Sequence, residues 1–328
     1  MHPHSGCFSG NNNNKPYNMK KIIVILAALS VSFGMAQAQS LEEITDLYNT
    51  GASMLTSGDR ELALKAFEQA YEQAQLLGPD GQEMADKCKE VIPDLYLSIA
   101  KGMVNDADYA GALAQLDKAV EIANSFGDTG VADEASALLP VVLKQNGGVL
   151  LNNKDYAGAA DAYRKALEIN PSDGVAALRL GLALNGADDL EGAKAALAQA
   201  AANGQESAAN KQLATINLKE AAAAVKAKKY ADAVTAALEA AKYNETVQAY
   251  QIAASASQVL GKTSDAISYY EKCLEIDPDA KNATQIAFTI GALYQQSKNN
   301  AKAVEFYQKA VSDPALGAQA QQLINALK

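Results

Sequence analysis

Histidine and tryptophan are nearly absent from this sequence. The 328 residues include two histidines, His2 and His4, and no tryptophan. Both histidines precede an apparent secretion signal, so we expect the mature chain to have no imidazole. That excludes Ser-His and Cys-His nucleophiles and histidine-ligated metals. Three cysteines, of which Cys7 also precedes the signal, are too few for a disulfide framework.

Positive charge is also scarce, with 28 Lys and Arg against 38 Asp and Glu, a net charge of −10. Binding to nucleic acid requires clustered cations that displace the counterions of the phosphates. We therefore predict no nucleic-acid partner, no metal and no cofactor.

Residues 19–38 have the order of a secretion signal. Two lysines precede the apolar run from Ile22 to Leu29, and Ala36-Gln37-Ala38 has the small-x-small pattern of a cleavage site. The run is too short for a stable membrane span. We expect cleavage after Ala38 and a periplasmic or secreted mature chain that begins at Gln39 and has no membrane span.

Residues 1–18 precede that signal and include an asparagine tract from Asn11 to Asn14. Low-complexity tracts of this kind do not form a packed core. We interpret residues 1–18 as a disordered extension upstream of a true start at Met19.

The remainder of the chain is repetitive. Asp108-Tyr-Ala-Gly-Ala112 recurs as Asp155-Tyr-Ala-Gly-Ala159, an offset of 47 residues, and the same offset places Pro93 on Pro140. Self-similarity at a fixed offset indicates stacked supersecondary units.

The repeated unit has a small–large–small pattern with spacings of four and three, which places all three positions on one helical face. The first positions are Ala63, Ala112, Ala159, Ala193, Ala233, Ala266 and Ala303. The second are Phe67, Leu116, Tyr163, Leu197, Ala237, Tyr270 and Tyr307, and the third are Ala70, Ala119, Ala166, Ala200, Ala240, Cys273 and Ala310. Twelve residues before each first position, on a preceding helix, are Gly51, Ala100, Gly147, Gly181, Ala221, Ala254 and Gly291.

Turn signals separate the two helices of each unit, as in Ser57-Gly58-Asp59 and Asn152-Asn153. Asp108 and Asp155 are predicted N-caps, whose carboxylates accept hydrogen bonds from free backbone N–H groups. The pattern therefore predicts one continuous all-α domain of helix–turn–helix units over residues 39–314. The stripe Leu316, Ala320, Leu323 and Leu327 predicts a capping helix within residues 315–328.

The first two repeat intervals, 49 and 47 residues, imply elongated helices, with Pro93 and Pro140 inside the long first helices and expected to kink them. The stretch from Gly147 to Pro171 resembles the tetratricopeptide repeat family, and Lys272 to Pro278 repeats its closing residues. The resemblance implies a right-handed α-solenoid of about seven repeats. In units four and five, Ala177 and Asn217 replace the large first-helix residue of the family.

Three other motifs have simpler interpretations. Gly261-Lys262-Thr263 lacks the earlier glycine of a phosphate-binding loop and is expected to be a turn. Asp106 and Asp108 have the spacing of calcium ligands, but Ala110 occupies a ligand position. Cys88 and Cys273 fall in the second and sixth units, too far apart for a disulfide. Cys273 occupies a position that alanine holds in the other units, so we expect it to act as a small buried hydrophobe.

The resemblance implies that first helices line a concave groove that holds a peptide or protein partner. Carrying over the groove positions gives a predicted partner-binding set of Lys101, Asn105, Lys144, Gly148, Asn152, Leu182 and Asn185. Units six and seven add Gln251, Ser255, Gln258, Phe288 and Gln295. Gly148 occupies the slot of an asparagine that the family uses to clamp a partner's C-terminal carboxylate, so chaperone-tail binding is not predicted.

We therefore expect an exported protein-interaction scaffold or adaptor and not an enzyme. The alternative is a solenoid of the cell envelope that binds glycans or small ligands. Sugar binding usually needs a flat aromatic platform, for which Tyr96, Tyr243, Tyr250 and Tyr294 are the candidates near first helices.

Overall fold

The computed structural model describes residues 40–327 of the 328-residue chain. The predicted signal, its cleavage site and the extension at 1–18 lie outside the described residues. Every regular element within 40–327 is helical, which confirms the all-α prediction. The first helices of seven repeats are α2 (Leu41–Thr56), α4 (Gln82–Asn105), α6 (Thr129–Asn152), α8 (Gly174–Gly186), α10 (Glu206–Lys226), α12 (Val247–Val259) and α14 (Ala283–Gln296).

The second helices are α3 (Arg60–Leu77), α5 (Tyr109–Phe126), α7 (Tyr156–Ile169), α9 (Leu190–Ala200), α11 (Tyr230–Tyr243), α13 (Thr263–Ile276) and α15 (Asn300–Ala310). A short 3₁₀ segment, Gly78–Gly81, follows α3, and α16 (Gly317–Leu327) follows the last repeat. In the connection Ala201–Gln205 between α9 and α10, Asn203 and Gly204 leave the helical region. None of the described helices is long and apolar enough to cross a membrane.

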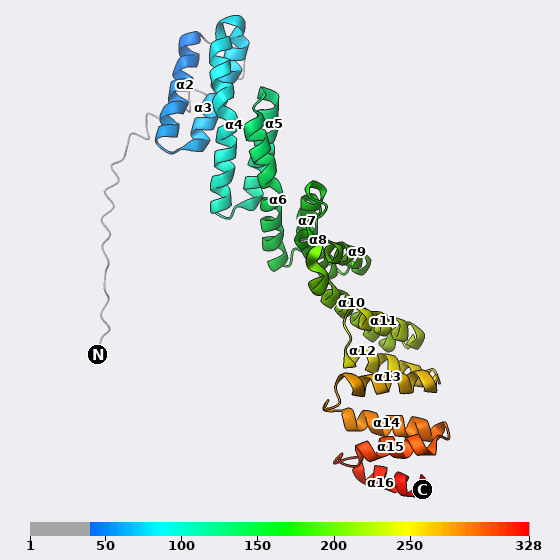
Figure 1. Cartoon of the computed structure of the whole chain (residues 1–328). Helices are drawn as coiled ribbons and strands as arrows, with labels where there is room; N and C mark the ends of the chain where they lie inside the picture. Colours follow the sequence, from blue (N-terminus) through cyan, green and yellow to red (C-terminus); the bar gives the residue numbers. More distant parts are fainter. Residues whose placement is uncertain (1–39, 328) are drawn as a thin grey trace, which may run out of the picture. The chain divides into compact units, whose positions relative to one another are not determined.

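The described chain divides into two compact units, residues 40–95 and 96–327, although the repeat pattern predicts one continuous domain. The division falls inside α4. In a repeat array each element packs only on its neighbours, so the pattern itself does not fix where compact units separate. Within the second unit, each helix packs beside the one that follows it (Figure 1).

The predicted packing positions are buried throughout. The first small residue of each unit, from Ala63 to Ala303, is fully buried, and the large residues after them are at most 7% exposed. Where the first helix has glycine, the side chain of the second helix lies against it. A Cβ atom on Gly147 would be 2.9 Å from the ring of Tyr163, and one on Gly291 would be 2.7 Å from that of Tyr307. The absence of a side chain therefore lets the paired helices approach closely.

The aspartate N-caps are also present. Asp108 accepts from the Gly111 N–H at 3.0 Å and Asp155 from the Gly158 N–H at 3.0 Å, which confirms both predictions. Asp59, Asp189 and Asn299 do the same in three other repeats. Repeats five and six differ, because Lys229 and Lys262 occupy the N-cap positions of α11 and α13 and no side chain caps either helix.

The long first helices are confirmed as well. Both α4 and α6 have 24 residues and continue through Pro93 and Pro140, whereas α8 and α12 have 13 residues each. At the C-terminal end, Ala320 and Ile324 of α16 are buried with Ala303, Tyr307 and Ala310 of the last repeat. This contact covers an apolar face that an ending array would otherwise expose.

Candidate partner-binding surfaces

The seven residues of the predicted partner-binding set lie on the first helices α4, α6 and α8. Lys101, Asn105 and Asn152 are exposed, and the other four are half-buried. The structure therefore places the whole set on first helices, as the repeat pattern implies.

Both lysines of the set form ion pairs that link consecutive first helices. Lys101 Nζ on α4 lies 2.7 Å from Glu134 Oε1 on α6. Lys144 Nζ on α6 lies 2.6 Å from Asp173 Oδ2, and Asp173 also caps α8 by accepting from the Ala176 N–H at 2.9 Å. Lys144 thus holds the N-terminus of the next first helix, a structural role that its own sequence context did not reveal.

The electrostatics of Asp173 fit this role. Partial burial raises the pKa of its carboxyl, but the hydrogen bond from Lys144 and those from the backbone N–H groups of Ala176 and Val175 outweigh the burial. The pKa of Asp173 therefore lies below its ordinary value, and the carboxylate is charged at neutral pH.

Gly148 and Asn185 are half-buried members of the set with different surroundings. A Cβ atom on Gly148 would lie 3.8 Å from the Tyr163 hydroxyl, an ordinary contact, so this glycine is not required for helix packing. Asn185 has a buried Oδ1 atom with no hydrogen-bond partner in the described structure. That oxygen is shielded from solvent, so it is not presented to a partner.

Four groove positions of units six and seven are engaged by neighbouring side chains. Tyr270 lies 3.1 Å from Ser255 Oγ and donates to Gln258 Oε1 at 3.3 Å. The equivalent Tyr307 donates to Gln295 Oε1 at 2.7 Å, and its ring lies 5.2 Å from that of Phe288. Second-helix tyrosines therefore fix several of the first-helix side chains that the sequence suggested as free contacts.

Gln251, the remaining position in this group, accepts a hydrogen bond at Oε1 from the Asn282 side chain at 3.3 Å. Asn282 precedes α14, so this contact again links two consecutive first helices.

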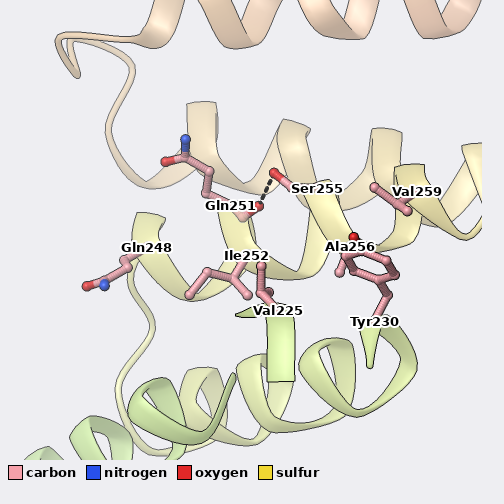
Figure 2. Close-up of a pocket in the computed structure, with 8 residues that line it drawn as sticks. All are labelled: Val225, Tyr230, Gln248, Gln251, Ile252, Ser255, Ala256 and Val259. Carbon is pink, nitrogen blue, oxygen red and sulfur yellow. Dashed lines mark hydrogen bonds between the residues drawn. The ribbon is translucent and has the colours of Figure 1, made fainter. Parts of the chain in front are cut away.

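One hollow surface was not anticipated from the sequence. A cleft of about 370 Å³, which we call the α10–α12 cleft, is lined by Val225, Tyr230, Gln248, Gln251, Ile252, Ser255, Ala256 and Val259 (Figure 2). Two of its apolar residues remain accessible, because Val225 is 38% exposed and Val259 is 61% exposed. The sequence signal for this cleft was a valine at the end of each of two neighbouring first helices. Neither valine occupies a packing position of the repeat, so the repeat pattern did not single them out.

The four tyrosines considered for sugar binding are all half-buried, and two have clear packing roles. The ring of Tyr294 stacks on Phe306 at 5.7 Å, and its hydroxyl donates to Glu271. Tyr250 lies 6.4 Å from Tyr269 and donates to Glu245. Among the described residues, this pairing favours tyrosines as packing elements over open platforms.

The two cysteines within the described range, Cys88 and Cys273, are free and buried. Burial raises the pKa of each thiol to about 11, so neither is a reactive thiolate at neutral pH. No cluster of three His, Cys, Asp or Glu side chains suited to a metal occurs in the part of the chain that the structure describes.

Comparison with known proteins matches three segments of the chain to a repeat family. The tetratricopeptide repeat model matches residues 147–173, 247–280 and 284–312. No curated protein was found to match the chain.

Similar solved structures include a MamA protein, with 21% identity, 56% of this chain and 96% of that chain covered, and a TM-score of 0.35. Another is YrrB, described as a TPR protein with an unusual peptide-binding site, with 22% identity, coverages of 56% and 91%, and a TM-score of 0.33. A third is the TPR2AB domain of yeast Sti1 in complex with pHSP90, with 18% identity, coverages of 88% and 99%, and a TM-score of 0.34.

Proposed function

We propose that this chain, which contains tetratricopeptide repeats, is an exported protein-interaction scaffold that holds a peptide or protein segment against its first helices. The observation that carries the proposal is that the first and second helices of the repeats have different roles. The large second-helix residues, such as Tyr163, Leu197 and Tyr307, are buried in the packing between helices. The first helices keep exposed amides at Asn105 and Asn152 and line most of the apolar α10–α12 cleft.

The chemistry of that surface suits a polypeptide partner. Amide side chains both donate and accept hydrogen bonds, as the backbone of an extended peptide requires. Leu182 is half-buried on α8 and adds apolar contact. Lys101 and Lys144 contribute less to partner binding than their charge suggests, because both already form ion pairs with acidic residues of the array.

Export is supported by the order of residues 19–38, with two lysines, an apolar run and Ala36-Gln37-Ala38. The test is N-terminal sequencing of the native protein from fractionated cells. We expect Gln39 as the first residue, in a fraction outside the cytoplasm. Native protein that starts at Met1 or stays in the cytoplasm would refute export without touching the binding proposal.

Binding is tested by site-specific photo-crosslinking in the native cells. A photoreactive residue at Asn105 or Asn152 on first helices is compared with one at Arg164 or Lys165, which are exposed on the second helix α7. We expect protein adducts from the first-helix positions and few from the controls. Equal yields from all four positions, or adducts only with glycans, would overturn the proposal. The absence of enzymatic activity stays a prediction.

A further inference from the structure

The turns beside the α10–α12 cleft have an unusual charge. Lys226, Lys228 and Lys229 connect Val225 to Tyr230, two residues that line the cleft, and Lys262 lies three residues after Val259. With Asp232 and Asp265 on the same stretches, the local balance is four cations against two anions, a net +2 in a chain of net −10.

The four lysines are available to a partner. All are exposed, and none forms an ion pair with any residue in the described range. By contrast, several lysines of the first helices form ion pairs with residues outside their own helix, as Lys101 does with Glu134, Lys144 with Asp173 and Lys219 with Asp188. The cationic rim of the cleft is therefore not used to hold the repeats together.

Two of these lysines also work against local stability. Lys229 and Lys262 stand where Asp or Asn caps the second helix in five other repeats, and lysine has no acceptor for the free N–H groups. A cation near a helix N-terminus is also electrostatically unfavourable. Their position beside the cleft fits a binding role better than a structural one.

We infer that the α10–α12 cleft binds a partner segment in which an apolar side chain is followed by acidic residues. This rests on the proposed scaffold function and assigns the chemistry of the partner. Figure 2 places Tyr230 and Val259 at one end of the cleft and Gln248 at the other. The apolar group of the partner contacts Val225, Ile252 and Val259, and its acidic residues extend past Tyr230 and Val259 toward the lysine-bearing turns.

The direction of the segment follows from the opposite end of the cleft. Glu245 lies three residues before Gln248 and accepts from the Tyr250 hydroxyl. A carboxylate there repels an acidic segment, while the Lys228 and Lys262 turns attract it. The acidic part of the partner is therefore placed at the Tyr230 end.

The probe is a fluorescein-labelled synthetic peptide with a Phe-Leu pair followed by a run of glutamates, measured by fluorescence anisotropy with the full chain. Two matched peptides replace the glutamates with lysine or the Phe-Leu pair with serine. We expect only the first peptide to bind, and its affinity to fall as salt is raised, because the four cations are exposed.

The rim variant carries Lys228→Asp and Lys229→Asp. Repeat four has Asp188 and Asp189 at the equivalent positions. The backbone is left-handed in both turns, with a φ of 65° at Asp188 and 57° at Lys228. The variant therefore gives repeat five a turn sequence that the array already contains in repeat four. We expect affinity to fall by about tenfold or more, since attraction becomes repulsion, while the melting temperature rises because α11 gains a cap. The matched control, Lys154→Asp with Lys298→Asp, has the same charge change at equivalent left-handed positions and keeps its affinity.

The apolar half of the site is tested by Val259→Ser. The control is Val175→Ser on α8, where the valine is also exposed, at 49% against 61% for Val259. We expect only Val259→Ser to weaken binding. Unchanged affinity in the rim variant, equal binding of the lysine peptide, or no binding of any peptide would overturn the inference. So would self-association of the chain that the cleft variants abolish, because it would make a second copy the occupant. Native crosslinks confined to α4, α6 and α8 would overturn it while leaving the scaffold function standing.

Discussion

Gly181 on α8 and Leu197 on α9 form a packing pair whose mutational behaviour follows from the structure. A Cβ atom on Gly181 would lie 2.6 Å from Leu197 Cγ and 3.3 Å from the Ala193 carbonyl oxygen. Leu197 is fully buried, so it has no free space into which to move. In repeat five, the equivalent positions hold Ala221 and Ala237, so the array already contains an alanine–alanine version of this pair.

We expect Gly181→Ala to change the free energy of unfolding with opposite signs in two backgrounds. Replacing a helical glycine by alanine contributes about 1 kcal/mol of helix propensity, and overpacking against Leu197 costs about 1–3 kcal/mol. In the wild-type background the net effect is a loss of up to about 2 kcal/mol. Leu197→Ala alone costs about 2–5 kcal/mol, because it leaves a cavity. Once Leu197 is alanine the clash with its side chain is gone and only the 3.3 Å contact with the Ala193 carbonyl oxygen remains, so Gly181→Ala then stabilises by up to about 1 kcal/mol.

The assay is urea unfolding followed by circular dichroism for the four members of this double-mutant cycle. An unchanged slope m across the variants checks that the same transition is compared. Gly102→Ala is the control, since a Cβ atom there would meet nothing within 4 Å, and we expect it to stabilise by about 0.5–1 kcal/mol. If Gly181→Ala has the same sign in both backgrounds, the proposed contact with Leu197 does not determine the packing.

Three further predictions concern caps, charge and thiols. Asp155→Ala should lower the free energy of unfolding by about 0.5–2 kcal/mol in a urea titration, because it removes the N-cap of α7. The control Asp161→Ala removes only an exposed ion pair with Arg164 and should change the free energy of unfolding by at most about 0.5 kcal/mol. Similar losses in the two variants would contradict the capping role of Asp155. Lys144→Ala should cost about 1 kcal/mol at neutral pH. Because the folded-state pKa of Asp173 is lowered, the stability difference between wild type and Lys144→Ala should persist above pH 3.8, the ordinary pKa, and vanish as the pH falls through the lowered pKa. A stability difference that does not depend on pH would count against the Lys144–Asp173 ion pair. Iodoacetamide should modify Cys88 and Cys273 far more slowly in the native chain than in urea, as judged by mass spectrometry of their peptides, and equal rates would argue against their burial.

The residues predicted successfully from the sequence are those whose role is repeated and local. The buried alanines, the aspartate caps and the glycine–tyrosine pair of Gly147 and Tyr163 each follow from a spacing within one helix pair, so a period reveals them. Lys144 and Asp173 are 29 residues apart, and their contact exists only because α6 and α8 lie side by side. The α10–α12 cleft likewise depends on how two repeats meet, which no spacing within either repeat encodes. The sequence therefore predicts which helices carry the binding surface better than which of their residues remain free.

The alanine-rich joint of repeat five bears on the order in which the array opens. Its buried cluster consists of Ala221, Ala237 and Ala253. A buried methyl group contributes only about 0.8 kcal/mol, where a buried leucine or phenylalanine side chain contributes about 1.5–3 kcal/mol. We expect amide hydrogen exchange to be fastest around this joint, because local opening follows the contact of least stability. Ile252 belongs both to the periphery of that cluster and to the lining of the α10–α12 cleft. A segment bound there would thus slow exchange at the weakest joint and stiffen the array on either side of it.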